Sequence, residues 1–263
     1  MARVIAIANQ KGGVGKTTTA INLAASLAAN ELRVLLIDMD PQGNSTTGLG
    51  ITKRDGLPTV YDVIAARAQL GEILLHIQPD GIHLAPSDRN LVAANVELVG
   101  TGQREFHLSR ALSPIKDQFD FVLIDCPPAL DLLTVNSLVA ADSVLIPIQC
   151  EFFALEGISQ LLDTIDRLRE SLQPRLAIEG ILLTMLDDRT NLARQVAADL
   201  REFFQGEVFR TIVPRSIRLA EAPSFGKTIL TYDPRSKGAE SYIQLAKEIV
   251  ANEQRRQLSQ SAR

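Results

Sequence analysis

The hydrophobic positions of this chain alternate between short continuous runs and longer segments in which apolar residues recur at helical spacing. The run Phe121-Val122-Leu123-Ile124 has no polar member, which is typical of a strand in a sheet that is covered on both faces. The alternation predicts a doubly wound α/β fold with a mostly parallel sheet flanked by helices on both faces. Strands are predicted near 3–8, 33–37, 82–85, 120–125, 143–148, 177–184 and 208–213. Helices are predicted near 16–29, 58–66, 88–98, 105–117, 131–139, 155–171, 190–204 and 238–252.

The length of 263 residues suits one large α/β domain. We predict a single domain over 1–252, followed by a polar C-terminal tail over 253–263, and we expect the stretch from Ala251 onward to fray. No apolar run approaches the length of a membrane span. Met1 leads within three residues into a strand rather than into a signal peptide. The two cysteines are then interpreted as reduced, buried thiols of a cytoplasmic protein.

A glycine-rich loop lies between the first predicted strand and the first predicted helix. Its end, Gly15-Lys16-Thr17, matches the pattern G-x-x-x-x-G-K-[ST], but Gln10 stands where that pattern has its first glycine. Backbone N–H groups of such a loop form a nest for phosphate oxygens, and the helix N-terminus adds positive charge. Lys16 is the candidate cation for the phosphates, and Thr17 supplies a hydroxyl to Mg²⁺. A glycine-rich turn with an exposed lysine is the alternative, but the strand, loop and helix occur in the order that the nucleotide motif requires. The predicted nucleotide-binding residues of the loop are Lys11, Gly12, Gly13, Val14, Gly15, Lys16, Thr17 and Thr18.

Acidic residues follow two further predicted strands. Asp38 and Asp40 come after the run Val34–Ile37, and Asp125 comes after Phe121–Ile124. Ligands of open α/β sheets bind at the carboxyl ends of the strands, and an aspartate at the end of such a strand holds Mg²⁺ in phosphoryl-transfer sites. An Asp-Pro turn is the simpler interpretation of the first pair, but the phosphate loop favours a nucleotide site.

Together these segments resemble the ParA/MinD family of deviant Walker ATPases, and within it the short, chromosomal ParA (Soj-type) partition proteins. The resemblance covers about residues 2 to 250. It rests on 9–18, 38–44, 125–128 and the run from Val213-Pro214-Arg215 to Ala222-Pro223-Ser224-Phe225-Gly226-Lys227. It implies a P-loop NTPase fold and an ATPase with ATP and Mg²⁺ as its cofactors.

The resemblance implies catalytic roles for Lys11 and Asp40. Lys11 would reach across a two-fold interface to the ATP of a second subunit, so that ATP drives formation of a homodimer with two sandwiched nucleotides. Asp40 would position the attacking water. A solvated lysine beside the loop is the alternative for Lys11.

The same resemblance assigns the remaining contacts with the nucleotide. Thr17, Asp38 and Asp125 would surround Mg²⁺. The adenine would lie near Met185 and near Pro214-Arg215, largely through backbone contacts.

Basic residues are concentrated in one segment of the chain. Between 210 and 237 there are six basic residues and two acidic ones, about +4, in a chain of net charge -4. Such a local excess suits phosphate backbones, and the resemblance implies that the ATP-bound dimer binds double-stranded DNA non-specifically. We expect contacts to phosphates rather than stacked bases, although a merely solvated charged face is the alternative. The candidate DNA-binding residues are Arg189, Arg218, Lys227 and Lys247.

The resemblance also implies a ParB-like centromere-binding partner that stimulates hydrolysis, and hence a cytoplasmic, nucleoid-associated protein. The phosphate loop begins at residue 9, so we expect no preceding DNA-reading domain. The pattern leaves open whether the cargo is a chromosome or a plasmid.

Four other functions compete with partition. A MinD-like membrane-positioning ATPase needs a C-terminal amphipathic helix, and Leu258 is the only large apolar residue after Val250. A nitrogenase-type iron protein needs cluster-ligating cysteines, and we interpret Cys126 and Cys150 as packing residues instead. A tyrosine autokinase typically has a tyrosine-rich tail, which this chain lacks. A nucleotide-dependent scaffold that does not hydrolyse ATP also stays open.

Overall fold

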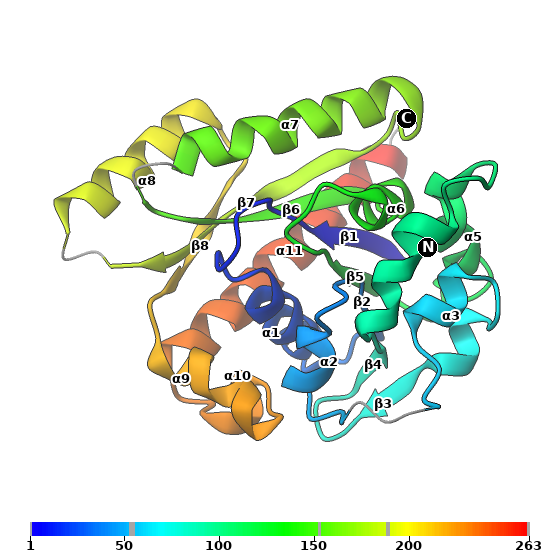
Figure 1. The fold of residues 1–263 in the computed structure, drawn as a ribbon. Helices are drawn as coiled ribbons and strands as arrows, with labels where there is room; N and C mark the ends of the chain where they lie inside the picture. The colour runs from blue at the N-terminus through cyan, green and yellow to red at the C-terminus, as the bar shows by residue number, and fades with distance from the viewer. Residues whose placement is uncertain (1, 53–55, 152–153, 188–189, 262–263) are drawn as a thin grey trace.

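The computed structural model describes residues 2–52, 56–151, 154–187 and 190–261. In this part of the chain, eight strands form one sheet in the order β3-β4-β2-β5-β1-β6-β7-β8 (Figure 1). The described pairs are parallel except β3–β4, which is antiparallel at the edge. The strands are β1 (Arg3–Ile7), β2 (Val34–Asp38), β3 (Leu75–Ile77), β4 (Ile82–Ala85), β5 (Phe121–Asp125), β6 (Ser143–Gln149), β7 (Ala177–Leu186) and β8 (Val208–Pro214).

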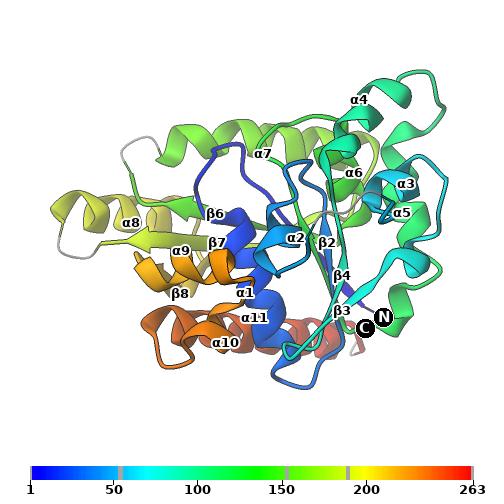
Figure 2. The same cartoon turned by 60° about the horizontal axis from the view of Figure 1, so that its bottom comes forward.

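Helices cover both faces of the sheet, which confirms the predicted doubly wound fold (Figures 1 and 2). The helices on one face are α1 (Lys16–Ala28), α9 (Ile217–Glu221), α10 (Ile229–Tyr232) and α11 (Lys237–Ser261). Those on the other face are α3 (Val60–Ile64), α4 (Ala94–Glu97), α5 (His107–Leu112), α6 (Leu132–Ala140), α7 (Ala154–Ser171) and α8 (Asn191–Phe203). The short helix α2 (Asn44–Gly48) packs against α1. The 3-10 helices are η1 (Leu70–Ile73), η2 (Arg89–Ala93), η3 (Arg104–Phe106), η4 (Lys116–Gln118) and η5 (Ala222–Phe225).

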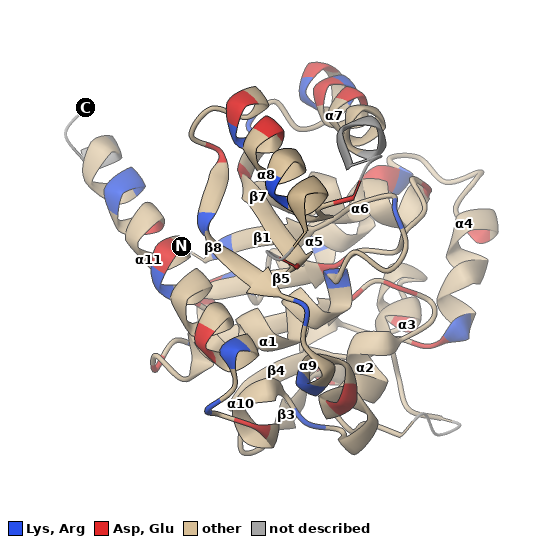
Figure 3. Ribbon diagram, turned by 90° about the vertical axis from the view of Figure 1, so that its left-hand side faces the viewer, with Lys and Arg blue, Asp and Glu red and all other residues tan. Residues whose placement is uncertain are grey.

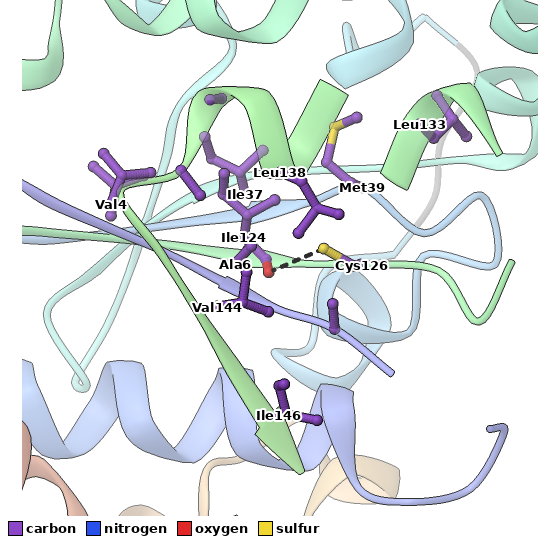
Figure 4. Packing of buried hydrophobic residues seen from close by; sticks show 14 of the residues in the cluster. Val4, Ala6, Ile37, Met39, Ile124, Cys126, Leu133, Leu138, Val144 and Ile146 are labelled. Carbon is purple, nitrogen blue, oxygen red and sulfur yellow. Dashed lines mark hydrogen bonds between the residues drawn. The ribbon is translucent and has the colours of Figure 1, made fainter. Parts of the chain in front are cut away.

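The continuous apolar runs of the central strands divide between two hydrophobic cores. Val4 and Ala6 of β1 pack with Ile124 of β5 under α6, whereas Ile5 and Ile7 point to the opposite face, under α1 and α11. Figure 4 shows the first core, where Leu133 and Leu138 of α6 lie over the strands. Because successive side chains of a strand point to opposite faces, each run must be apolar at every position to fill both cores.

The structure departs from the predicted elements where segments are short. The edge strand β3 and the helices α2, α9 and α10 have no predicted counterpart, because three to five residues carry little periodicity. The predicted helices 88–98 and 105–117 are each broken into α-helical and 3-10 pieces.

The expectation of a frayed C-terminal stretch is wrong for 251–261, because α11 continues to Ser261. The extension has a physical cause in Glu179 of β7. Its side chain is only 1% exposed, and its Oε2 accepts hydrogen bonds from Arg3 of β1 and Arg256 of α11, each at 2.7 Å. Ser143 of β6 donates to the same oxygen at 2.7 Å. The polar end of α11 is thus bound to the sheet by its basic side chain.

The Glu179 cluster predicts a pH-dependent contribution to stability. Burial by itself would raise the pKa of Glu179, but Arg256 and Arg3 outweigh it and hold that pKa below its usual value. A lowered carboxyl pKa stabilises the fold above the pKa of the unfolded chain, about 4.3, and the stabilisation is lost as pH falls through the folded value. We expect Glu179→Gln to lower the free energy of unfolding at neutral pH by about 2 kcal/mol, less than for a fully buried pair because both arginines reach water.

Urea unfolding at neutral pH and again below pH ~4 measures this difference. Glu207→Gln, at an exposed acid, is the control. A loss of stability that is the same at both pH values would contradict the role given to the Glu179 charge.

Candidate nucleotide-binding site

The site lies where three neighbouring strands end together. In the parallel register, Asp125 of β5 is level with Ile7 of β1 on one side and with Asp38 of β2 on the other. The glycine-rich loop follows β1 directly and leads into α1. The backbone register therefore places the loop beside both acidic strand ends, as the sequence predicts.

The loop conformation depends on its glycines and on contacts with the far strands. Gly13 and Gly15 have φ of 75° and 90°, which side chains with a Cβ rarely adopt. The Val14 carbonyl accepts a hydrogen bond from the Thr184 hydroxyl of β7 at 2.8 Å. Asn9 donates to the Pro147 carbonyl of β6 at 2.7 Å and accepts from the Lys11 N–H at 3.0 Å. The loop is thus preformed by bonds to β6 and β7.

A cavity of about 390 Å³ opens over this loop, a size within the range of small-molecule sites. A larger cavity, of about 640 Å³, lies between α3 and α5, and its described lining includes no residue of the loop. The lining of the smaller cavity consists of Gly12, Gly13, Gly15, Lys16, Thr17, Thr18, Asp40, Gln42, Asn44, Pro128 and Met185.

Lys16 is held at the floor of this cavity. It is 7% exposed, and its Nζ donates to the Lys11 carbonyl at 3.1 Å. Burial lowers the pKa of Lys16, and the nearby charges of Asp125 and Asp40 oppose that change. A phosphate group in the cavity would stabilise the ammonium further.

Asp125 is fully buried and does not belong to the described cavity lining, but one of its oxygens has no hydrogen-bond partner among the described residues. Its Oδ2 accepts from the Ser45 hydroxyl at 2.8 Å, and its Oδ1 has no hydrogen-bond partner in the described part of the chain. Burial, followed by the neighbouring Asp38, raises the pKa of Asp125 to about 8, and the hydroxyls of Ser45 and then Thr17 oppose the rise. A carboxylate oxygen without a hydrogen-bond partner suits Mg²⁺, which prefers oxygen ligands.

Asp38 is fully buried, and both of its oxygens already accept hydrogen bonds. Oδ2 accepts from the N–H and the hydroxyl of Thr46 at 2.8 and 2.7 Å, and Oδ1 accepts from the Asp40 N–H at 3.2 Å. Burial raises the pKa of Asp38 to about 6. In this arrangement Asp38 organises the segment between β2 and α2, and among the described residues it does not line the cavity.

Asp40 does line the cavity and is 6% exposed. Its Oδ1 accepts from the Gln42 N–H at 2.9 Å. The Ser87 hydroxyl donates to the Asp40 carbonyl at 2.8 Å, and the Ser87 N–H donates to the Thr46 hydroxyl at 2.9 Å. The sequence predictions missed Ser45, Thr46 and Ser87. The available signal for Ser87 is its place just after β4, at the same edge of the sheet.

Lys11 is placed differently from the rest of the loop. Its side chain is 39% exposed, and its Nζ forms an ion pair with Oε2 of Glu151 at 2.7 Å, just after β6. Among the described residues, Lys11 is absent from the cavity lining, whereas Lys16 is part of it. The two lysines of the loop therefore face different surroundings.

Of the residues predicted to contact adenine, Met185 lines the cavity, whereas Pro214 and Arg215 do not. Met185 lines the cavity and has a φ of 50°. Pro214 pairs with Leu186 across β7 and β8, and the Arg215 N–H donates to the Leu186 carbonyl at 3.3 Å. Pro214 and Arg215 are thus adjacent to Met185 along the strand ends, but they do not belong to the described lining.

Comparison with known proteins identifies the family. Residues 2–178 match a sequence family described as an AAA domain. The sporulation initiation inhibitor protein Soj of Bacillus subtilis (strain 168) is 52% identical over 252 residues, which cover 96% of this chain and 100% of that protein. The chromosome partitioning protein ParA of Myxococcus xanthus (strain DK1622) is 53% identical over 248 residues, 94% of this chain and 88% of that protein. This chain belongs to the ParA/Soj family of chromosome-partitioning ATPases.

The fold of this ParA/Soj chain also matches a solved structure with nucleotide. The cobyrinic acid a,c-diamide synthase of Mycobacterium smegmatis with a bound ATP analogue and magnesium has a TM-score of 0.84 and is 37% identical. The match covers 95% of each chain. That likeness confirms the predicted P-loop fold, and the family confirms the predicted ATPase activity.

Three of the four candidate DNA-binding residues of the ParA/Soj chain are described, and all three are exposed. Lys227 and Lys247 are exposed, and Arg218 of α9 is 57% exposed but forms ion pairs with Glu221 at 3.2 Å and Asp233 at 3.6 Å. Basic residues lie on α9, near α10 and at the start of α11, with acidic residues among them (Figure 3). Arg189 lies outside the described residues. Both acidic residues of the segment thus lie against Arg218, whose charge they offset.

Both cysteines are buried thiols. Burial raises the pKa of Cys126 to about 12 and that of Cys150 to about 11. A cluster ligand must be a thiolate, so this burial agrees with the packing interpretation. Among the described residues, no helix combines the length and the apolar character needed to cross a membrane.

The unpaired oxygen of Asp125 predicts a magnesium-dependent effect of one substitution. We expect Asp125→Asn to weaken ATP binding at least about tenfold in Mg²⁺, because a neutral amide is a poorer ligand for the ion. In EDTA, by contrast, the two proteins should bind ATP with similar affinity. Isothermal titration calorimetry in each buffer measures the difference.

A stability measurement provides the control for folding. With its pKa raised, Asp125 retains a proton in the ligand-free fold that the unfolded chain loses near pH 4, so stability falls as pH rises from about 4 to 8. Asp125→Asn should remove this decline and be the more stable protein at pH ~8, by about 1 kcal/mol or more. If the ATP affinity of the two proteins depended equally on Mg²⁺, the assignment of Asp125 as a magnesium ligand would be contradicted.

Proposed function

We propose that ATP closes two copies of this chain into a nucleotide sandwich dimer, that the dimer binds DNA non-specifically, and that hydrolysis releases it. The observation that carries the proposal is the second lysine of the phosphate loop. Lys11 is paired with an exposed glutamate instead of facing the cavity of its own subunit. It is therefore available to another molecule.

In the proposed site, the residues divide by what they would hold. The backbone of Gly12 to Gly15 and the Lys16 ammonium bind the phosphates. Thr17 and Asp125 hold Mg²⁺, which would supply charge neutralisation during phosphoryl transfer. Asp38 acts by keeping the segment from Asp40 to Thr46 in place. Asp40, at the cavity wall, orients the water that attacks the γ-phosphate.

The ion pair of Lys11 with Glu151 supports a mobile role for the lysine. Both side chains are well exposed, at 39% and 48%, and exposed ion pairs contribute at most about 1 kcal/mol. Polyphosphate of a second subunit is a stronger partner for an ammonium than one carboxylate. Lys11 can thus leave Glu151 when the partner contains ATP, and the charge of the γ-phosphate makes closure depend on ATP rather than ADP.

The proposed DNA surface is the segment from Arg210 to Lys237. Its exposed cations would contact phosphates without reading sequence, which suits coating of a nucleoid. A ParB-like partner that stimulates hydrolysis completes the proposed cycle.

Substitution of Lys11 tests the closed dimer. We expect Lys11→Ala to bind ATP within about threefold of wild type, because Lys16 and the loop are intact, but to stay monomeric in ATP. Light scattering behind a sizing column, in ADP and in ATP and each with and without non-specific DNA, gives the measurement.

The matched variant is Glu151→Gln, which removes the intramolecular partner of Lys11 and should dimerise in ATP at least as well as wild type. If Lys11→Ala dimerised at the same ATP concentration as the wild-type protein, the role proposed for Lys11 would be refuted. A wild type that is monomeric in ATP would refute the sandwich dimer itself.

Substitution of Asp40 separates dimerisation from turnover. We expect Asp40→Ala to form the ATP-dependent dimer but to release phosphate at least about 100-fold more slowly, because the attacking water is no longer oriented. Steady-state phosphate release and sizing are measured on the same preparation, with the surface variant Asp117→Ala as control. Normal turnover in Asp40→Ala would rule out this role.

A further inference from the structure

One aromatic side chain is exposed within the basic segment. Phe225, the last residue of η5, is 63% exposed, although phenylalanine is among the residues most often buried. One face of its ring stacks on Tyr232 of α10, with ring centroids 5.2 Å apart and planes at 26°. The sequence-based expectation of phosphate contacts alone did not take account of this ring.

The pair of rings, Phe225 and Tyr232, is linked to Arg218 through the side chain of Glu221. The Tyr232 hydroxyl donates to Oε2 of Glu221 at 3.0 Å, and the same oxygen accepts from Arg218 at 3.2 Å. Arg218 also pairs with Asp233 at 3.6 Å. One acidic side chain thus fixes both the tyrosine that supports Phe225 and the guanidinium beside it. The exposed Lys227 follows Phe225 by two residues.

Phe225 also borders an open groove of about 540 Å³ between η5 and the segment after α2. Thr47, Ile51, Thr52 and Ser224 line it together with Phe225. Gly226 packs on Gly50 so closely that a Cβ at Gly226 would lie 2.6 Å from the Gly50 Cα. The close backbone contact keeps the two walls of the groove together. A volume of this size accommodates a base and its sugar.

We propose that Phe225 is a stacking platform for an unpaired base of single-stranded DNA, with Arg218 and Lys227 at the flanking phosphates. The inference rests on the proposed DNA binding and adds a contact that is not electrostatic. Stacking on an aromatic ring tolerates any base, since every base has a π-face. In a duplex those faces are covered by neighbouring bases, so the ring selects single strands. The exposed cations Arg218 and Lys227 of the same segment favour nucleic acid over an apolar protein surface.

The experiment separates the stacking contact from the phosphate contacts by salt dependence. Affinity of the full chain in ATP and Mg²⁺ is measured for a single-stranded oligonucleotide and for the matching duplex, over a series of salt concentrations. Phe225→Ala should weaken binding to the single strand by about fivefold or more, with the same slope of log affinity against log salt. Arg218→Ala should instead reduce that slope, because it removes a phosphate contact.

Two further variants control for exposure and for folding. Phe203 of α8 is 67% exposed and lies outside the basic segment, so Phe203→Ala should bind like wild type. Phe225→Trp keeps a ring on Tyr232 and should retain single-strand affinity, which a general disturbance of η5 would not allow.

The outcomes distinguish failure of the stacking role of Phe225 from failure of the proposed DNA binding. If wild type binds duplex but not the single strand, or if Phe225→Ala binds the single strand as wild type does, the stacking role is overturned and the proposed DNA binding stands. If wild type binds neither DNA in ATP, the proposed DNA binding falls as well.

Discussion

The parallel pairing of β2 with β5 is the constraint on which the site depends. Its register sets Asp38 directly against Asp125, and the burial of the strand ends removes both from water. The two carboxyls have raised pKa values, and the pKa of Lys16 beside them is lowered. The ligand-free site therefore disfavours the charged forms of all three groups. Magnesium and phosphate are the ions that would stabilise those charged forms, so binding and the folded arrangement favour each other.

The same buried acids organise the chain on either side of them. Asp38 bonds to Thr46, Thr46 to Ser87, and Ser87 to the Asp40 carbonyl. The segment that starts at Asp38, at the carboxyl end of β2, thus continues through α2 to Gly50, where it packs on Gly226 of the basic segment. The cavity wall and the proposed DNA surface belong to one connected part of the fold.

The strand ends and the phosphate loop could be predicted because their physical signals are local. A strand buried on both faces, such as Phe121–Asp125, must be apolar throughout, and Gly15 must be glycine for its left-handed conformation. Helix α2 carries no such signal, since Asn44–Gly48 has low helix propensity and begins after a glycine. The bonds of Ser87 to Asp40 and of Glu151 to Lys11 could not be predicted because the partners are 47 and 140 positions apart. The ion pairs of Arg218 also escaped prediction, since counting charges along a segment does not show which of them neutralise each other.

In the proposed dimer, the pair between Lys11 and Glu151 would make closure an exchange rather than a gain of an ion pair. Each subunit that gave up its own contact would receive one across the interface, so the number of paired ammonium groups would stay the same. The partner of the Lys11 ammonium would change from the carboxylate of Glu151 before closure to the phosphate chain of ATP after closure, which is the stronger acceptor. The difference in binding free energy between ATP and ADP would then act directly on the dimer interface. Lys11 would have an anionic partner both before and after closure, so no unpaired ammonium group would have to be accommodated there. In that dimer, Lys11 would be neutralised by Glu151 before the two copies meet, and specificity for the nucleotide would enter with the exchange of partners.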